Sequence, residues 1–205
     1  MKFIDLSYTL SNETKSSPFD NPLKIERTKF IDKDYYNDST LTSTMHIGTH
    51  IDAPSHMTSI EKDIDSYPVE KFIGNGVILD FKNEKFIALR EEDKKKISKD
   101  DIVIIYTGSE KINGTDEYYY NHPQVSKEFS EYLVEKEVKM LALDFFSPDS
   151  SPSLIHKTLL SNDILIVENL KNTHLLLNEM KFKLYMIPLK IKTEGSFIRA
   201  FAEIK

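Results

Sequence analysis

Short apolar runs separated by polar turns recur along the chain, and most of them have the length and composition of β-strands. Such runs span roughly four to eight residues, are rich in Ile, Val, Leu and Phe, and are bounded by Gly, Pro, Asn or Asp. The pattern predicts strands over Lys2–Leu6, Leu23–Phe30, Leu41–Ile51, Gly76–Phe81, Ile102–Tyr106, Lys139–Asp144, Ile164–Glu168 and Lys183–Ile191.

Two stretches have helical rather than strand periodicity. In Ser126–Glu137 apolar residues recur four positions apart after acidic residues, and Ser126 stands where an N-cap is expected. In Ser153–Leu160 a leucine-rich run follows Ser153, which is a second candidate N-cap. Strands interspersed with a few helices predict a mixed α/β fold, with a mixed sheet and a few flanking helices.

The chain length and composition favour one folded unit. The chain has 205 residues, which fits one domain or at most two small ones. Apolar residues make up 40% and charged residues 29%, so a buried core is feasible and disorder is not indicated. No repeat or Pro/Gly/Ser linker divides the sequence, and we therefore expect a single domain over residues 1–205.

The net charge and the absence of cysteine limit which partners the chain can bind and which chemistry it can perform. The formal net charge is −6, and basic residues such as Lys94–Lys96 follow acidic ones, so nucleic acid is not an expected partner. Without cysteine, disulfides and thiolate metal sites are excluded. Charges appear within the first five residues, and no apolar run approaches the ~18 residues of a membrane span. The expectation is a cytoplasmic protein with no membrane partner.

The segment Met45–His56 holds three of the six histidines of the chain, together with one aspartate. Gly48 and Pro54 oppose a helix, and an extended strand turns alternate side chains to one face. The residues expected on that face are His46, Gly48, His50 and Asp52. Two imidazoles and a carboxylate form an N/N/O set suited to a divalent metal, and Gly48 would leave room between them.

His56 follows Pro54 at the expected end of this strand, close enough to act on whatever a metal holds. An imidazole in that position is suited to acid–base chemistry near neutral pH. The alternative interpretation of the whole segment is a set of ordinary polar residues along a wet strand edge.

A second group of candidate residues lies about a hundred positions later. Glu168 ends a strongly apolar run, and a carboxylate there is costly unless it is paired, hydrogen-bonded or metal-bound. Asp144 ends a similar run, but it could instead cap the turn that follows. His156 lies among leucines between the two runs, and its alternative role is that of a core histidine. Glu168 is alternatively a strand-end acid that reaches water.

Other catalytic motifs are absent from the sequence. Thr107–Ser109 follows a strand, but its single glycine does not have phosphate-loop spacing. There is no Gly-x-Ser-x-Gly, and there is no cysteine. Nucleotide binding and covalent serine or cysteine catalysis are therefore not supported.

The pattern His-x-Gly-Thr-His-x-Asp-Ala-Pro-x-His over residues 46–56 resembles the signature of the cyclase superfamily, which includes bacterial kynurenine formamidase and isatin hydrolase. The resemblance extends over most of the chain. The further segments that carry it are Ile4–Ser7, Tyr106–Gly108, Gly114–Asp116, His122–Pro123, Asp144–Asp149, His156, Glu168–Leu170 and Arg199–Ala200.

The resemblance implies a swivelling β/β/α fold with a divalent metal centre, in a homodimer or homotetramer. It implies a first metal held by His46, His50 and Asp52. Asp52, His156 and Glu168 would help to hold a second metal, so that one or two ions bind per subunit, with zinc expected first and manganese as the alternative. His56 would be the acid/base residue or an additional ligand.

The sequence departs from the family pattern in two places. The segment Ser17–Pro22 lacks the glycine of the family's aromatic-Pro-Gly-Asp motif, and the chain has no tryptophan. Some members place a tryptophan against an aromatic substrate, so Phe19 or another aromatic residue would have to take that place here.

The leading functional hypothesis is metal-dependent hydrolysis of a small amide by a metal-bound hydroxide, with an aryl formamide of the N-formylkynurenine type as substrate. In this hypothesis His56 moves the protons. One alternative is hydrolysis of isatin or another cyclic amide or lactone. The other is a metal-loaded binding protein without turnover.

Overall fold

A mixed β-sheet that closes on itself forms the body of the protein. The structure is a computed structural model that describes residues 1–204. The eight strands follow the order β1-β12-β11-β5-β7-β9-β10-β4, and β4 also pairs with β12, which closes the ring and leaves β1 outside it. Their bounds are β1 (Lys2–Asp5), β4 (His50–Asp52), β5 (Ile73–Asp80), β7 (Ile102–Tyr106), β9 (Met140–Leu143), β10 (Leu165–Glu168), β11 (Phe182–Pro188) and β12 (Gly195–Ile204).

The sheet separates two apolar cores. One core fills the interior of the ring and includes Ile51, Ile104 and Ala142. The other lies outside it, under helices α4 (Lys127–Glu135) and α5 (Leu154–Ser161). Strands β5, β7, β9 and β10 are parallel and have a core on each face, which explains why the last three are continuous apolar runs rather than alternating ones. The predicted mixed α/β fold is confirmed.

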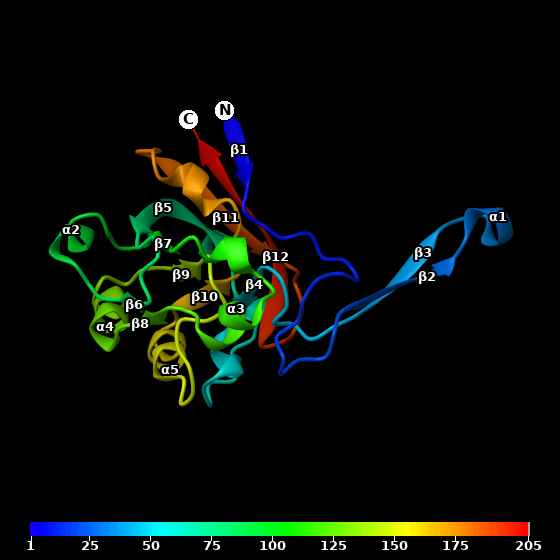
Figure 1. Ribbon diagram of the computed structural model, residues 1–205, viewed down its shortest axis with the longest axis horizontal. Coiled ribbons are helices and arrows are strands. Elements are labelled where there is room, and N and C mark those ends of the chain that lie inside the picture. The colour runs from blue at the N-terminus through cyan, green and yellow to red at the C-terminus, as the bar shows by residue number, and fades with distance from the viewer. Residues whose placement is uncertain (205) are drawn as a thin grey trace.

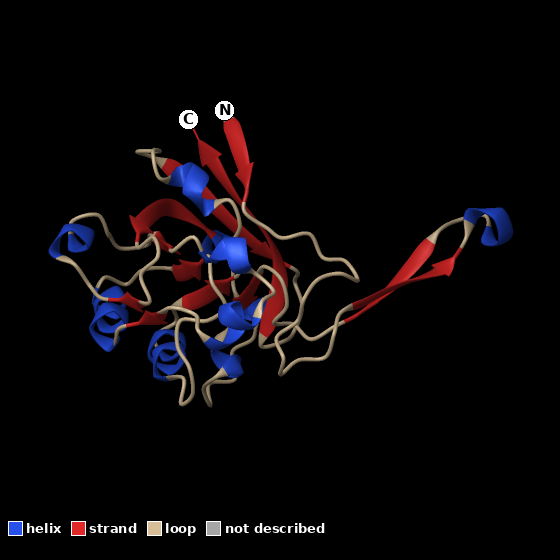
Figure 2. Ribbon diagram, in the orientation of Figure 1, coloured by secondary structure: helices blue, strands red, loops and turns tan. Residues whose placement is uncertain are grey.

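Short elements cover the remaining edges, as Figure 2 shows. They are the helices α2 (Glu91–Lys94) and α3 (Asp116–Tyr120), the strand pair β6 (Phe86–Ile87) and β8 (Gln124–Val125), and the 3₁₀ turns η1 (Pro54–His56), η2 (Ile64–Ser66), η3 (Val69–Phe72), η4 (Ser109–Ile112) and η5 (Thr173–Leu176). Among the described residues, no helix has the length and apolarity to cross a bilayer.

A two-stranded ribbon projects away from the body and is the most conspicuous feature of the outline (Figure 1). It consists of β2 (Lys24–Lys29), β3 (Asp38–Thr42) and the one-turn helix α1 (Ile31–Asp34) at its tip. The two strands pair only with each other. We call residues 24–42 the arm.

Seven of the eight predicted strands are confirmed within a few residues, and the one over Leu41–Ile51 is wrong. That segment divides into β3, a bend over residues 45–49 and the three-residue β4. Gly48 lies in the bend with φ of +60°, a conformation that glycine adopts without the steric cost of a side chain. A Cβ at Gly48 would lie 2.5 Å from Leu10 Cδ2, so the bend and its packing both require glycine.

Both predicted helices are present, but only one has the predicted cap. Ser126 Oγ accepts the Phe129 amide at 3.2 Å, as expected. Ser153 makes no capping hydrogen bond, and its backbone is left-handed. Asp149 takes its place, because its Oδ2 accepts the Ile155 amide at 2.6 Å.

Strand β12 is the longest strand, and the sequence pattern did not predict it. Its buried positions alternate, but Ala200 and Ala202 occupy two of them and Gly195 begins the strand. Alanine and glycine have weak strand propensity, so the sequence of this segment does not show the apolar pattern of a strand. The ring nevertheless closes through β12.

We expect Ile51→Ala to lower the free energy of unfolding by about 2–5 kcal/mol, because it opens a cavity in the ring interior beside the site. Ile51 is fully buried on β4. Urea unfolding followed by circular dichroism measures the change. Ile60→Ala, at a half-exposed position, is the matched control and should cost far less. A loss below 1 kcal/mol at Ile51 would show that β4 is not packed as described.

Candidate metal centre

The short strand β4 places its two polar side chains at the centre of a buried cluster. It lies antiparallel between β10 and β12, so His50 pairs with Glu168 on one side and Asp52 pairs with Gly195 on the other. Directly opposed residues project to the same face of a sheet, which brings His50 and Glu168 together from positions 118 residues apart. His50 Nε2 lies 3.4 Å from Glu168 Oε2 and 3.6 Å from Asp52 Oδ1.

His46 reaches the same cluster from the bend and not from a strand. Its Nδ1 lies 2.8 Å from Asp52 Oδ1. The room for its ring comes from Gly195, because a Cβ there would lie 2.8 Å from His46 Cε1 and 3.1 Å from the Ile51 carbonyl. The expected role of Gly48 as the spacer is therefore wrong, since Gly48 forms the turn.

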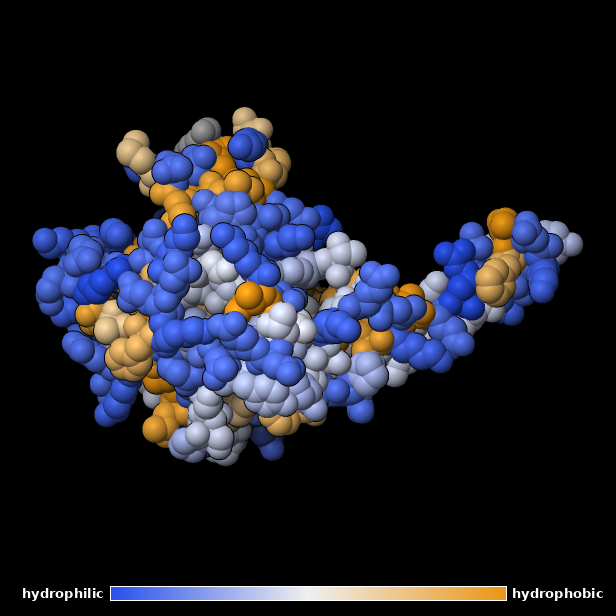
Figure 3. All heavy atoms as spheres, viewed as in Figure 1, coloured by the Kyte–Doolittle hydropathy of each residue, from blue (hydrophilic) through white to orange (hydrophobic). Residues whose placement is uncertain are grey.

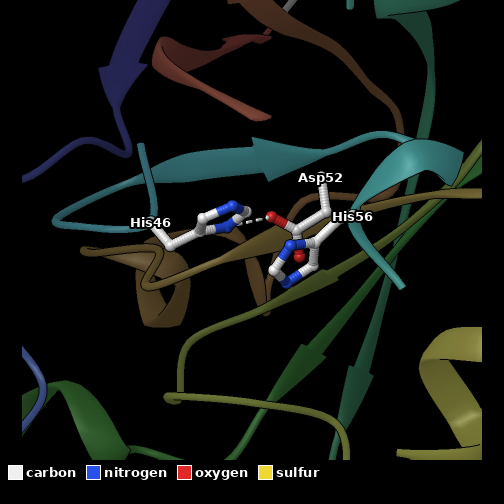
Figure 4. A group of neighbouring side chains, drawn as sticks. All are labelled: His46, Asp52 and His56. Atoms are coloured by element: carbon white, nitrogen blue, oxygen red, sulfur yellow. Dashed lines mark ion pairs between the residues drawn. The ribbon is translucent and has the colours of Figure 1, made fainter. Parts of the chain in front are cut away.

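His56 lies in η1, and its ring packs against that of His46. The two imidazoles stack with centroids 3.9 Å apart and planes inclined by 24°. Figure 4 shows both imidazoles beside the Asp52 carboxylate, with the ion pair to His46 as a dashed line. Burial lowers the pKa of His56, and the neighbouring histidines lower it further although Asp52 opposes them. A lowered pKa favours the neutral imidazole, which can accept a proton.

His156 enters from α5 and completes the cluster. Its Nε2 lies 3.4 Å from Glu168 Oε1 and 3.8 Å from Asp52 Oδ2. Its other nitrogen, Nδ1, lies 2.6 Å from Asp149 Oδ1. When the imidazole is neutral, this carboxylate keeps the proton on Nδ1, and the Nε2 lone pair is then available to a cation in the cluster.

His50 has a matching arrangement with a backbone partner. Its Nδ1 lies 2.9 Å from the Gly48 carbonyl, which can only accept a hydrogen bond. The proton is therefore on Nδ1, and Nε2 offers its lone pair to the space between the carboxylates. Asn169 Nδ2 donates to the same carbonyl at 3.0 Å and holds the bend in place.

The polar atoms of this cluster fit a divalent cation. Eight buried side-chain nitrogen and oxygen atoms of the described residues have no hydrogen-bond partner, and five of them are here. They are His46 Nε2, His50 Nε2, both carboxylate oxygens of Asp52, and Glu168 Oε1. Buried carboxylate atoms without partners are costly, and neutral imidazoles with carboxylates are a donor set for zinc, manganese and similar metals. The residues present therefore suit a metal that the fold family implies.

Two groups have ligand atoms close enough for one ion, and both contain Asp52. One is His46, Asp52 and His56, and the other is His50, Asp52 and Glu168, with all ligand atoms of a group within 4.8 Å of one another. His156 adjoins the second group through its 3.4 Å approach to Glu168. The ligands can therefore be assigned to one or two metal ions in more than one way. Which ligands hold which ion stays a prediction.

When no cation is bound, the histidines and the carboxylates of the cluster compensate one another's charges. Burial alone would lower the pKa of His46, but Asp52 raises it to about 9. Burial would likewise lower the pKa of His156, while Asp149 and Glu168 raise it to about 10. Burial raises the pKa values of Asp52 and Glu168, yet the facing histidines hold both below their usual range. Protons on two histidines therefore substitute for metal charge.

Asp144 is not part of this cluster. Its carboxylate accepts the amides of Thr107 and Gly108 at 2.7–3.0 Å and the Thr107 hydroxyl at 2.7 Å. Burial raises its pKa to about 6 despite these bonds. Asp144 does cap a turn, as the alternative interpretation held, but the turn is the one after β7 and not the one after β9.

Sequence reasoning missed two carboxylates that hold the ligands. Asp149 was detectable, because it stands a few residues before a helix where a capping carboxylate is favoured. Glu194 precedes β12, with Oε1 3.4 Å from His46 Nε2, and no local pattern marks it. Asp149 lies on the side of His156 away from the cluster, and Glu194 lies near Nε2 of His46.

A cavity of about 460 Å³ opens onto the cluster. Its walls include His46, His56, His156 and Glu168 on one side, and the aromatic residues Phe19, Tyr119, Tyr120 and Phe146 elsewhere. Tyr119 and Phe146 meet edge to face at 5.2 Å, and His122 packs against Phe146 at 5.5 Å. Phe19 lies at the exposed rim against Tyr120. The cavity is thus suited to a small flat molecule beside the carboxylates.

The chain resembles known proteins along most of its length. Residues 4–150 match the family model described as "Putative cyclase". An uncharacterised protein of Methanocaldococcus jannaschii is 32% identical over 204 residues, covering 98% of this chain and 99% of that protein. A kynurenine formamidase of Bacillus thuringiensis is 26% identical over 204 residues, covering 97% and 96%.

Solved structures share the fold. Isatin hydrolase A from Labrenzia aggregata, bound to benzyl benzoate, superposes with a TM-score of 0.87 at 21% identity, covering 99% of this chain and 93% of that one. A potential metal-dependent hydrolase with cyclase activity superposes with a TM-score of 0.78 at 21% identity, covering 98% and 96%.

We expect Asp149→Asn to weaken divalent-metal affinity by about 10–100-fold. The asparagine amide can still accept from the Ile155 amide, but it would donate to His156 Nδ1 and move the imidazole proton to Nε2. Competition with a chelating dye measures the affinity. Asp20→Asn, on the cavity wall but without a contact to a histidine, is the control. Equal affinities for Asp149→Asn and wild type would contradict the role of Asp149.

We also expect metal affinity to rise with pH. In the metal-free protein the pKa values of His46 and His156 are raised, so protonation of these histidines stabilises the fold. This stabilisation is complete below pH 6.5 and is lost as the pH rises through about 9 to 10. A cation must displace those protons, so affinity should increase up to tenfold per pH unit for each proton released. Calorimetry between pH 6 and 8 in buffers of different ionisation enthalpy counts the protons. Binding without proton release would contradict the charge compensation described above.

Proposed function

The chain belongs to the cyclase family of metal-dependent hydrolases, and we propose that it hydrolyses a small amide, with an aryl formamide of the N-formylkynurenine type as substrate. We propose that residues 1–205 act as one domain with one or two divalent cations, zinc first and manganese second. The single observation that carries the proposal is the set of unpartnered carboxylate and imidazole atoms with the His56 ring beside it.

The proposed ligands are His46, His50, Asp52, His156 and Glu168. A bound divalent cation supplies a Lewis acid that polarises a carbonyl and lowers the pKa of water to about 7. Asp149 and the Gly48 carbonyl hold two of the imidazoles with their Nε2 atoms toward the ion.

His56 is the proposed proton carrier. It lies in the cavity wall, outside the sheet layer that holds His50 and Glu168, and its neutral imidazole nitrogen can take a proton from attacking water. The same nitrogen can return that proton to the leaving amine, so formate and an arylamine would be released from a formamide. His46 stacks on His56 and orients its ring.

The aromatic wall supports an aryl substrate over an aliphatic one. Phe146 and Tyr119 present ring faces and edges to the cavity beside the cluster, and aromatic pairs of this kind add about 0.5–1.5 kcal/mol to apolar burial. Cyclic amides such as isatin share this chemistry, and the kynurenine formamidase and isatin hydrolase relatives make both substrates worth testing. A homo-oligomer and a cytoplasmic location stay part of the proposal.

The test is hydrolysis of N-formylkynurenine and of isatin by purified protein, before and after chelation and after restoring zinc or manganese. We expect formamide hydrolysis that disappears on chelation and returns with metal. If the protein hydrolyses isatin faster than N-formylkynurenine, a cyclic amide would replace the formamide as the proposed substrate. Metal binding without turnover on either substrate, or on a panel of amides, esters and lactones, would contradict the enzymatic function.

His56→Ala should lower kcat by about 10²–10⁴-fold while metal content stays at the wild-type level. A parallel loss of metal would instead make His56 a ligand, in line with its place in the group with His46 and Asp52. His174→Ala is the control, since His174 is a half-exposed histidine that pairs with Glu110 outside the cavity. Wild-type turnover in metal-loaded His56→Ala protein would contradict the proton-transfer role.

A further inference from the structure

Asn169 lies beside the cluster, at the point where the pairing of β4 with β10 ends. The last pair of that ladder is His50 with Glu168, and Asn169 follows with a left-handed backbone, at φ of +57°. Asparagine is one of the few residues that tolerate this conformation. Asn169 is buried, so the amide of its side chain must find its hydrogen-bond partners within the protein.

Asn169 holds the bend before His50 through both its side chain and its backbone. Its Nδ2 donates to the Gly48 carbonyl at 3.0 Å, and the second hydrogen bond of that carbonyl is with His50 Nδ1 at 2.9 Å. Both lone pairs of the oxygen are thereby used. Thr49 Oγ1 donates to the Asn169 carbonyl at 2.7 Å. The residue that follows Glu168 therefore fixes the two residues that precede His50.

The Gly48 carbonyl also determines which way the Asn169 amide faces. A carbonyl can only accept, so the amide turns its nitrogen toward Gly48 and its Oδ1 away from it. Oδ1 lies 2.5 Å from the Tyr118 hydroxyl and can likewise only accept, so the phenol is the donor. Burial raises the pKa of Tyr118 well above its usual value and keeps the proton on the phenol. One directed series of hydrogen bonds thus leads from Tyr118 to the carbonyl that His50 contacts.

Tyr118 lies inside the protein, on helix α3, with 1% of its surface exposed. Figure 3 shows that hydrophilic residues cover most of the visible face of the body, and Tyr118 is beneath such a surface. The rings of Tyr119 and Phe146 pack against it, with centroids at 5.4 and 6.4 Å. A phenylalanine would fill this space without burying a hydroxyl, which needs a partner. Packing alone therefore does not account for the phenol, whereas the hydrogen bond to Asn169 does.

We propose that Tyr118 is a positioning residue of the metal centre, which acts through Asn169 to hold the bend that carries His50. The proposal rests on the proposed function in one respect, namely that His50 and Glu168 hold a cation. Without the Tyr118 hydroxyl, the buried Asn169 Oδ1 has no donor, and the amide is no longer fixed in the orientation that serves Gly48. His50 is then held less firmly toward a cation, although every ligand is still present.

Tyr118→Phe tests the proposal, because it removes one hydroxyl and keeps the ring. We expect divalent-metal affinity, measured by competition with a chelating dye, to fall about tenfold, at the lower end of the range for groups that orient metal ligands. Tyr119→Phe is the matched control. Its hydroxyl is on the next residue of the same helix but donates to the Lys15 carbonyl at 3.1 Å, outside the cluster. This control should bind metal as tightly as wild type.

Asn169→Gly separates an action through Asn169 from an independent one. Glycine keeps the left-handed backbone and removes only the amide side chain. We expect Asn169→Gly to lose at least as much metal affinity as Tyr118→Phe. The double variant Tyr118→Phe/Asn169→Gly should bind metal no more weakly than Asn169→Gly alone, because the hydroxyl then has nothing to act through. A double variant in which the two losses multiply would overturn the action through Asn169.

The visible absorption of cobalt-loaded protein distinguishes orientation of a ligand from simple destabilisation of the fold. At saturating cobalt(II) the positions and intensities of the bands report the geometry of the ligands. We expect altered bands in Tyr118→Phe and wild-type bands in Tyr119→Phe. A lower thermal midpoint of Tyr118→Phe, with unchanged metal affinity and unchanged bands, would overturn the proposal and leave Tyr118 as a core residue.

The same measurements separate this proposal from the proposed function. A wild type that binds metal but hydrolyses no substrate would contradict the proposed function, while a loss of affinity in Tyr118→Phe would still support the positioning role. Equal affinities of wild type and Tyr118→Phe in an active hydrolase would overturn the positioning role alone. A wild type that binds no divalent metal would overturn both.

Discussion

The burial of two facing carboxylates, Asp52 and Glu168, is the constraint on which the rest of the site depends. They project from adjacent strands into one buried space, where like charges repel strongly. Something positive must lie between or beside them. Histidinium at His46 and His156 meets this need in the metal-free protein, and a divalent cation meets it better, since it also satisfies the unpartnered oxygen and nitrogen atoms.

Much of the fold was predictable because apolar runs of strand length are reliable signals when both faces are buried. Strands β7, β9 and β10 illustrate this, as each is buried throughout. The failures have physical reasons. Strand β12 closes the ring with alanine and glycine at inward positions, and the bend before β4 depends on tertiary hydrogen bonds from Asn169 that no local pattern encodes.

The sequence identified the candidate ligands, but these residues come together by a different backbone path from the one expected. A straight strand would have aligned His46 with His50 and Asp52. Instead the bend returns His46 over Asp52, and Gly195, from the far end of the chain, makes room for it. His56 and His156 then reach the cluster from two short helices. The alternating pattern therefore identified residues that do cluster, but it described the backbone incorrectly.

Anomalous diffraction at the zinc absorption edge, on crystals of zinc-loaded protein, tests the central claim most directly. We expect a strong peak about 2.0–2.2 Å from ligand atoms of His50, Asp52 and Glu168, where the unpartnered atoms converge. Zinc-loaded crystals with no peak in this cluster, or with the peak only at surface residues, would contradict the claim that these buried carboxylates exist to hold a metal.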